Sequence, residues 1–283
     1  MARPADRNPD NVPGEWYIDL RCIDCGASPH VAPGLIDHVG SRCVFVRQPV
    51  TDHEITQAWR AVDVCPTASV GAPVSLPRPT RIFPVEVAPG VHLCGHNSPD
   101  SFGAHSWLVV RPGGNVLIDS PRYTRRLQPA IDELGGVSLV LLTHRDDVAD
   151  AEQWATRYGA DVVIHAADAG AAPFATRIVE GTEPSPLADG VTAVPVPGHT
   201  RGSVVYLVDG RAFTGDSLAW DPAAEDLYAF RDACWYSWPE QSASLQRLAG
   251  HPFTQVFAGH GRWSPPLPAD DMARRLAAYA ARM

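Results

Sequence analysis

The sequence carries PGHTRGS at residues 197–203, TGDS at 214–217 and AGHGR at 258–262, three short phrases in a fixed order. Each phrase ends an apolar run such as VTAVPV or TQVF, which is typical of a buried strand. The glycine that follows lets the backbone turn sharply, so that the next side chain projects into a cleft. The three loops therefore predict a cluster of two imidazoles and one carboxylate, supplied by His199, Asp216 and His260.

Composition narrows the classes of function. All 23 basic residues are arginine, and the absence of lysine excludes Schiff-base, pyridoxal-phosphate and P-loop chemistry. A net charge of −9 without a basic cluster argues against nucleic acid and favours a small-molecule substrate. The first 20 residues lack the apolar core of a signal peptide, and no run approaches membrane-spanning length. We therefore expect a cytoplasmic protein that does not act at a membrane.

The chain divides at a proline-rich stretch, TASVGAPVSLPRPTRIFP, at residues 67–84. We expect a small α+β unit over residues 1–78, with strands in WYIDL and CVFVRQ and a helix over residues 52–65. Residues 79–283 alternate strands with helices, which predicts a layered α/β core. The expected strands are 105–110, 115–119, 137–142, 161–165, 191–196, 203–208, 211–215 and 254–258, and the expected helices lie near 123–134, 150–158, 239–249 and 269–282.

The ordered phrases resemble the metallo-β-lactamase superfamily over about residues 82–283, which implies an αββα sandwich that binds a metal pair. The family's remaining ligands come from an HxHxDH loop, which here reads THRDDVADA at residues 143–151 and lacks one histidine. The resemblance implies a first site of His144, Asp146, His199 and Asp216. A second site would keep only Asp150, Asp216 and His260, so we expect it to be weak or vacant. Zinc and iron both remain open, because replacing imidazole by carboxylate favours iron or manganese.

Residues outside the expected metal ligands are predicted to support the site or line its cleft. In the resembling family the aspartate at Asp119 lies behind the metal loop and orients a ligand. His96 and His105 flank a loop that forms a flap in related proteins, and Trp235 belongs to an aromatic segment that is either core or pocket wall. We expect Asp147 to be a solvated residue at a helix start.

The cysteines of the N-terminal unit suggest a redox cofactor. Cys22, Cys25 and the Cys65–Pro66 pair resemble the single-cluster ferredoxin module, which holds a four-iron four-sulfur cluster. That module has a third near cysteine where this chain has Ser28, so the unit either keeps the ferredoxin-like fold without iron or completes the cage with Ser28 or Cys43.

These features predict a metal-dependent hydrolase that acts on an ester, thioester or lactone-like substrate through metal-bound hydroxide, with Asp150 or Asp216 orienting the water. One alternative is a non-haem iron oxidoreductase that receives electrons from the N-terminal unit or a redox partner. The other is a catalytically silent binding protein, because both prosthetic sites have lost a ligand.

Overall fold

The computed structural model describes residues 2–283. Its N-terminal unit packs two helices against two short antiparallel strand pairs, β1 with β4 and β2 with β3. Helix α2 begins at a reciprocal cap, in which the Thr51 hydroxyl accepts from the Glu54 backbone and the Glu54 carboxylate accepts from the Thr51 backbone. The elements are η1 (Pro4–Asp6), β1 (Tyr17–Ile18), α1 (Ala27–Val31), β2 (Ile36–Val39), β3 (Arg42–Phe45), α2 (Asp52–Val64) and β4 (Val70–Gly71).

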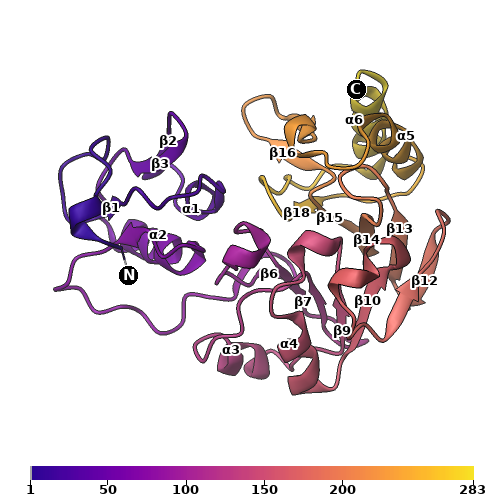
Figure 1. The fold of residues 1–283 in the computed structure, drawn as a ribbon, viewed down its shortest axis with the longest axis horizontal. Coiled ribbons are helices and arrows are strands. Elements are labelled where there is room, and N and C mark those ends of the chain that lie inside the picture. The colour runs from indigo at the N-terminus through magenta and orange to yellow at the C-terminus, as the bar shows by residue number, and fades with distance from the viewer. Residues whose placement is uncertain (1) are drawn as a thin grey trace.

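The larger unit is a sandwich of two sheets (Figure 1). Seven strands form the first sheet, in the order β11 (Arg177–Val179), β10 (Asp161–His165), β9 (Leu139–Leu141), β8 (Val116–Ile118), β7 (Trp107–Val109), β6 (Val91–Leu93) and β5 (Val85–Ala88). Five strands form the second, in the order β12 (Ser185–Ala188), β13 (Val191–Pro195), β14 (Val204–Val208), β15 (Arg211–Gly215) and β18 (Val256–Ala258). A separate hairpin pairs β16 (Ala219–Asp221) with β17 (Asp226–Tyr228).

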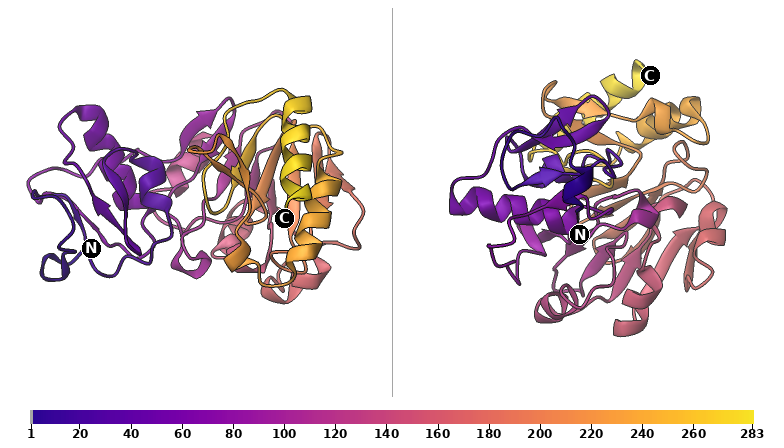
Figure 2. Two further views of the ribbon diagram at one scale, coloured as in Figure 1. Left: turned by 90° about the horizontal axis from the view of Figure 1, so that it is seen from above. Right: turned by 60° about the vertical axis from the view of Figure 1, so that its left-hand side comes forward.

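Helices cover the outer face of each sheet (Figures 1 and 2). Helices α3 (Gln128–Glu133) and α4 (Ala151–Tyr158) lie on the side of the seven-stranded sheet, and α5 (Trp238–Leu248) and α6 (Ala269–Ala281) pack together on the other. Short 3₁₀ helices are η2 (Pro99–Ser101), η3 (Arg145–Asp147), η4 (Ala166–Ala171) and η5 (Arg231–Ala233). This arrangement confirms the predicted α/β class and the αββα order.

Alternation along the strands builds two cores. On β14, Val204, Tyr206 and Val208 join the core between the sheets, whereas Val205 and Leu207 face the layer of α5 and α6. Residues of opposite faces alternate in this way because successive side chains of a strand point to opposite sides. Each face of the five-stranded sheet is therefore buried, which fixes the strand register and with it the loops that leave the strands.

Every predicted strand of the larger unit is present, two with the predicted bounds and six shorter by one or two residues at one or both ends. The structure adds strands that the sequence did not reveal, because short segments such as β5 and β12 mix exposed and half-buried residues. The helix expected from residue 123 begins only at Gln128, with Pro129 in its first turn. Residues 72–84 contain neither helix nor strand, in keeping with a linker, and the boundary at residues 78/79 stays a prediction.

No helix among residues 2–283 combines the length and the apolar character needed to cross a membrane.

Candidate metal centre

The metal-competent residues come from four loops at one edge of the sandwich. His144 follows β9 of the first sheet, whereas His199, Asp216 and His260 follow β13, β15 and β18 of the second. The two sheets therefore contribute to one site, and the glycines of the loops allow the close approach. A Cβ atom at Gly215 would lie 2.3 Å from the Thr143 hydroxyl and 3.3 Å from His144 Nδ1.

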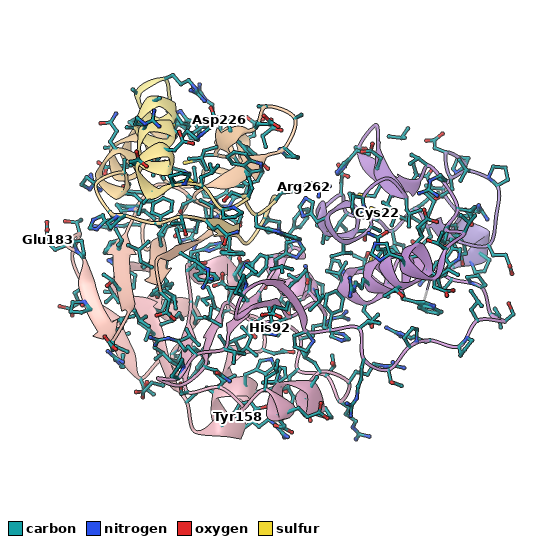
Figure 3. All side chains as sticks on the ribbon, turned by 180° about the vertical axis from the view of Figure 1, so that it is seen from behind. Cys22, His92, Tyr158, Glu183, Asp226 and Arg262 are labelled. Atoms are coloured by element: carbon teal, nitrogen blue, oxygen red, sulfur yellow. The ribbon has the colours of Figure 1, made fainter. Side chains whose placement is uncertain are left out.

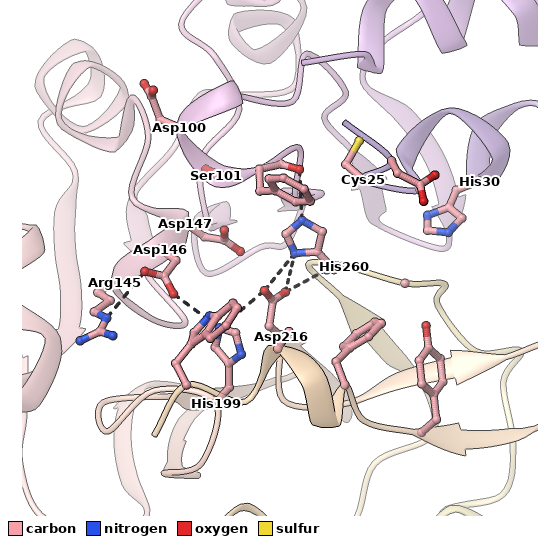
Figure 4. A pocket seen from close by; sticks show the side chains of 18 of the residues that line it. Cys25, His30, Asp100, Ser101, Arg145, Asp146, Asp147, His199, Asp216 and His260 are labelled. Atoms are coloured by element: carbon pink, nitrogen blue, oxygen red, sulfur yellow. Dashed lines mark hydrogen bonds and ion pairs between the residues drawn. The ribbon is translucent and has the colours of Figure 1, made fainter. Parts of the chain in front are cut away.

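The side chains converge on one point (Figure 4). Asp216 Oδ2 lies 3.7 Å from both His144 Nε2 and His199 Nε2. Asp146 Oδ2 lies 3.6 Å from His199 Nε2 and 3.9 Å from His144 Nε2. The two imidazole rings are almost perpendicular, with centroids 4.7 Å apart. The structure thus brings together the four residues that the sequence assigns to a first site.

The donor atoms fit a cation. Within the described chain, His144 Nε2, His199 Nε2 and both carboxylate oxygens of Asp147 are buried without a hydrogen-bond partner. Buried polar atoms are normally satisfied, so a convergent group of such atoms indicates a bound ion. Burial lowers the pKa of His144 to about 4, which leaves the imidazole neutral and able to coordinate a metal.

Asp147 belongs to this cluster, and the prediction of a solvated residue was wrong. Only 1% of it is exposed, and its Oδ2 lies 4.0 Å from His144 Nδ1. A Cβ atom at Gly259 would lie 3.0 Å from both Asp147 Oδ2 and Asp216 Oδ1, so the two carboxylates face the same glycine. Burial, and then the charge of Asp216, raises the pKa of Asp147 well above its usual range. A bound cation would favour its ionised form.

Asp150 is not part of the cluster, which corrects its expected roles as metal ligand and water-orienting group. Its Oδ2 accepts a hydrogen bond of 2.7 Å from the backbone N–H of Tyr123, and the residue stands at the start of α4. The 3₁₀ turn η3 places Asp147 toward the histidines and leaves Asp150 beyond the turn. The sequence offered one signal for Asp147, a carboxylate doublet separated from the loop histidine by Arg145 alone.

Asp216 and His260 form a tight pair. His260 Nδ1 lies 2.9 Å from both Asp216 oxygens, and the His260 backbone N–H donates to Oδ1 at 3.0 Å. Burial acts to raise the pKa of Asp216, but the charge and hydrogen bond of His260 outweigh it and hold that pKa far below its usual value. The carboxylate is therefore ionised and offers negative charge to a cation at the centre of the cluster.

A relay behind the cluster orients His144. Asp119 accepts hydrogen bonds of 2.8 and 3.0 Å from the Thr143 backbone N–H and hydroxyl, and that hydroxyl lies 3.0 Å from His144 Nδ1. Asp119 adopts a φ of 54°, a strained conformation for a residue other than glycine. Asp119 thus acts on His144 through Thr143 and does not touch the ring nitrogen itself.

Thr143→Val is expected to lower metal affinity about 10- to 100-fold, the usual cost of losing an outer partner of a metal ligand. The isosteric valine removes the hydroxyl and leaves one carboxylate oxygen of Asp119 without its side-chain donor. Titration with a competing chelator measures the change. Thr192→Val, on β13 away from the cluster, is the control, and equal affinities for the two variants would contradict the relay.

A cleft of about 940 Å³ opens above the cluster. Its apolar walls come from Phe102, Tyr228, Phe230 and Trp235, and the Trp235 ring lies 6.2 Å from that of His199. His96 and His105 do not line this cleft, which corrects their expected substrate-side role. His96 is buried against Phe83, with ring centroids 6.1 Å apart.

The N-terminal unit supplies the opposite wall of the cleft through Asp24, Cys25, Gly26, His30 and His38. His30 Nδ1 lies 3.0 Å from His105 Nε2, and Arg262 donates to the Pro29 carbonyl at 3.2 Å. Figure 3 places Arg262 at the boundary between the units. His105 therefore holds the flap to the N-terminal unit.

Of the four ligand positions of the ferredoxin module, this chain has cysteine at three. Cys22, Cys25 and Cys65 lie close enough for their charges to interact, but the fourth position is occupied by Ser28 in α1. Cys65 Sγ accepts from the Ser69 backbone N–H at 3.2 Å, and Cys22 forms a hydrogen bond with Cys43. The serine leaves the module's ligand set one thiolate short.

Comparisons with known proteins match two separate parts of the chain. Residues 18–72 match the family model of the 4Fe-4S single cluster domain of ferredoxin I. Two curated relatives are hydroxyacylglutathione hydrolases, from Acidiphilium cryptum strain JF-5 (33% identity over 55% of this chain and 63% of the relative) and from Xanthomonas axonopodis pv. citri strain 306 (30% identity over 54% and 59%). The chain thus spans about three fifths of the length of these relatives.

Among solved structures, the metallo-beta-lactamase FIM-1 from Pseudomonas aeruginosa, in its mono-zinc form, has a TM-score of 0.51 at 15% identity, over 70% of this chain and 94% of that one. At such low identity the likeness concerns the fold alone. The family model described as metallo-beta-lactamase superfamily matches residues 95–278, which include all four loops of the cluster. This chain therefore belongs to the metallo-beta-lactamase superfamily.

Proposed function

We propose that the protein is a metal-dependent hydrolase that cleaves a small thioester, or a related ester or lactone. The observation that carries the proposal is the convergence of the unpartnered Nε2 atoms of His144 and His199 with the Asp216 carboxylate at the floor of the cleft. The names of the curated relatives, both thioester hydrolases, favour a thioester over the other carbonyl compounds.

Each residue of the cluster has a distinct part in this proposal. His144 and His199 would hold one ion through Nε2, with carboxylate oxygens from Asp146 and Asp216, and Asp147 lies beside them. The ion would be zinc or iron, and it would supply the Lewis acidity that polarises a carbonyl and lowers the pKa of water. Asp216, which is ionised and held by His260, would keep the two histidines and the carbonyl of the substrate correctly placed around the ion.

The walls of the cleft would select and shield the substrate. Phe102, Phe230 and Trp235 present apolar surface that would exclude water and seat an acyl or thiol group. Arg145 stands at the rim, with its Nε 3.6 Å from Asp146 Oδ1, where it would hold that carboxylate toward His199.

An iron oxidoreductase is the second candidate. It is favoured by Asp146, a carboxylate where the family pattern has a histidine, which makes the donor set richer in oxygen. The incomplete thiolate cage of the N-terminal unit removes the electron source that this candidate would need from within the chain.

We expect hydrolysis of a thioester when the protein is loaded with zinc in air, without oxygen consumption or added reductant. The measurement compares a panel of thioesters and lactones under that condition and under ferrous iron with reductant and oxygen. His199→Ala should lose the activity, whereas His53→Ala, an exposed histidine of α2, should retain it.

If turnover occurs only with ferrous iron and oxygen is consumed in step with product, the hydrolase proposal is wrong and the oxidoreductase is supported. Tight metal binding without turnover in either condition would instead favour a binding protein.

A further inference from the structure

The N-terminal unit contains a second group of metal-competent side chains, on the far side of the cleft from His199. One donor atom from each of Asp24, His38 and Cys43 lies within 4.8 Å of the other two. The Asp24 Oδ1 atom is 2.8 Å from His38 Nδ1 and 3.6 Å from Cys43 Sγ, and Cys43 Sγ is 3.9 Å from His38 Nδ1. Cys22 reaches the same place, since its thiol forms a hydrogen bond with that of Cys43.

These separations suit a tetrahedral ion. Zinc–sulfur bonds of about 2.3 Å and zinc–nitrogen or zinc–oxygen bonds of about 2.0 Å put neighbouring donors about 3.3–3.8 Å apart. The three measured distances, 2.8, 3.6 and 3.9 Å, bracket that interval, so small side-chain adjustments complete the geometry. Two thiolates, one imidazole and one carboxylate are ligands that zinc accepts together.

The backbone geometry brings these residues together. His38 and Cys43 are directly opposite each other in the antiparallel pair of β2 and β3, so their side chains share one face of the hairpin. Asp24 has a φ of 59°, in the left-handed region that residues other than glycine rarely adopt. That strained turn directs its carboxylate to the hairpin, and strain of this kind gathers at ligand-binding sites.

The two nearby thiols have different neighbours. Cys22 forms a hydrogen bond with Cys43, whereas Cys25 lies against Gly103, where an added Cβ atom would be 2.8 Å from its sulfur. Figure 3 labels Cys22 within the N-terminal unit.

We propose that Cys22, Asp24, His38 and Cys43 form a mononuclear zinc site in the unit whose sequence resembles an iron–sulfur domain. All four coordination positions come from the protein, which is the pattern of a structural zinc site. The ion would tie the loop over residues 22–26 to the β2–β3 hairpin. Because Asp24 and His38 also line the cleft, it would fix the wall that faces the catalytic cluster.

Cobalt substitution of the full-length protein tests this site separately from the catalytic one. The catalytic donor groups contain no cysteine among the described residues, so near-ultraviolet thiolate-to-cobalt charge transfer cannot come from the catalytic site. We expect this absorption in the unmodified protein and in His199→Ala, which should lose one equivalent of metal. Cys22→Ser and Cys43→Ser should lose the absorption. Each should also lose one equivalent of metal, and it is not the equivalent that His199→Ala loses.

Three further variants complete the test. His38→Ala, at a half-exposed side chain that can be replaced without disturbing the core, should weaken zinc binding at this site at least about 10-fold, since one of four ligands is gone. Cys25→Ser and Cys65→Ser should keep the absorption, and circular dichroism checks that each variant is folded.

The proposal is overturned if Cys25 or Cys65 proves necessary, or if anaerobic protein holds about four irons with sulfide. It is equally overturned if no thiolate absorption develops, or if Cys22 and Cys43 are joined by a disulfide in protein kept under reductant. Loss of thioesterase activity alone would bear on the proposed function and leave this site untouched.

Discussion

Asp216→Ala is expected to abolish both tight metal binding and hydrolysis. The carboxylate lies 3.7 Å from both unpartnered histidine nitrogens, and it also fixes His260. Its removal takes away a buried negative charge that would hold a cation between His144 and His199. Elemental analysis should find no metal at this centre, and turnover of the thioester panel should fall to background.

The conservative variant Asp216→Asn separates chemistry from binding. Its amide keeps the volume of the carboxylate but withdraws the charge, so the turnover number should fall far more than the Michaelis constant rises. Asp189→Ala, at an exposed loop position, serves as the control. Full metal content in Asp216→Ala would show that the cluster does not bind metal as proposed.

Asp147→Asn and Asp150→Asn are expected to behave in opposite ways. At Asp147 the change should weaken metal binding by about 100-fold or more, beyond the upper end of what an outer partner contributes. It also buries an amide group whose two donors lack acceptors, at a cost of about 1–3 kcal/mol. At Asp150 the asparagine oxygen can still accept from Tyr123, so metal affinity should be unchanged and stability should fall by less than about 1 kcal/mol.

Chelator competition gives the affinities, and denaturant unfolding of the metal-free proteins gives the stabilities. The reverse outcome, with metal lost in Asp150→Asn and retained in Asp147→Asn, would mean that the loop over residues 144–150 rearranges when an ion binds.

Much of this architecture was predictable because its signals are local. A strand such as residues 203–208 can be recognised by its apolar run, and the glycine-containing phrases at His199, Asp216 and His260 indicate where the chain turns. Asp147 could not be assigned in the same way. Whether it or Asp150 faces the histidines depends on where the 3₁₀ turn η3 ends, because the chain leaves the turn after Asp147 and takes a positive φ of 36° at Ala149 before it reaches Asp150.

The N-terminal unit illustrates the same limit. The spacing of Cys22, Cys25 and Cys65 is visible in the sequence, but the pairing of His38 with Cys43 follows from the register of a hairpin. Register depends on turn geometry and on which face is buried, and neither is written in cysteine spacing. Cysteine spacing alone therefore predicts that Cys22, Cys25 and Cys65 act together. The folded unit instead brings Cys22 and Cys43 together with an imidazole and a carboxylate.

The contact between His30 and His105 limits how these two positions can change during evolution. Because one imidazole comes from each unit and they meet at 3.0 Å, neither position can change freely without the other. The same holds for Gly103, where an added Cβ atom would lie 2.8 Å from the Cys25 sulfur. Among homologues that carry both units, substitutions at these positions should covary, and homologues that lack the first unit should be released from the constraint. The cleft in that sense depends on both units, because each supplies one of its walls.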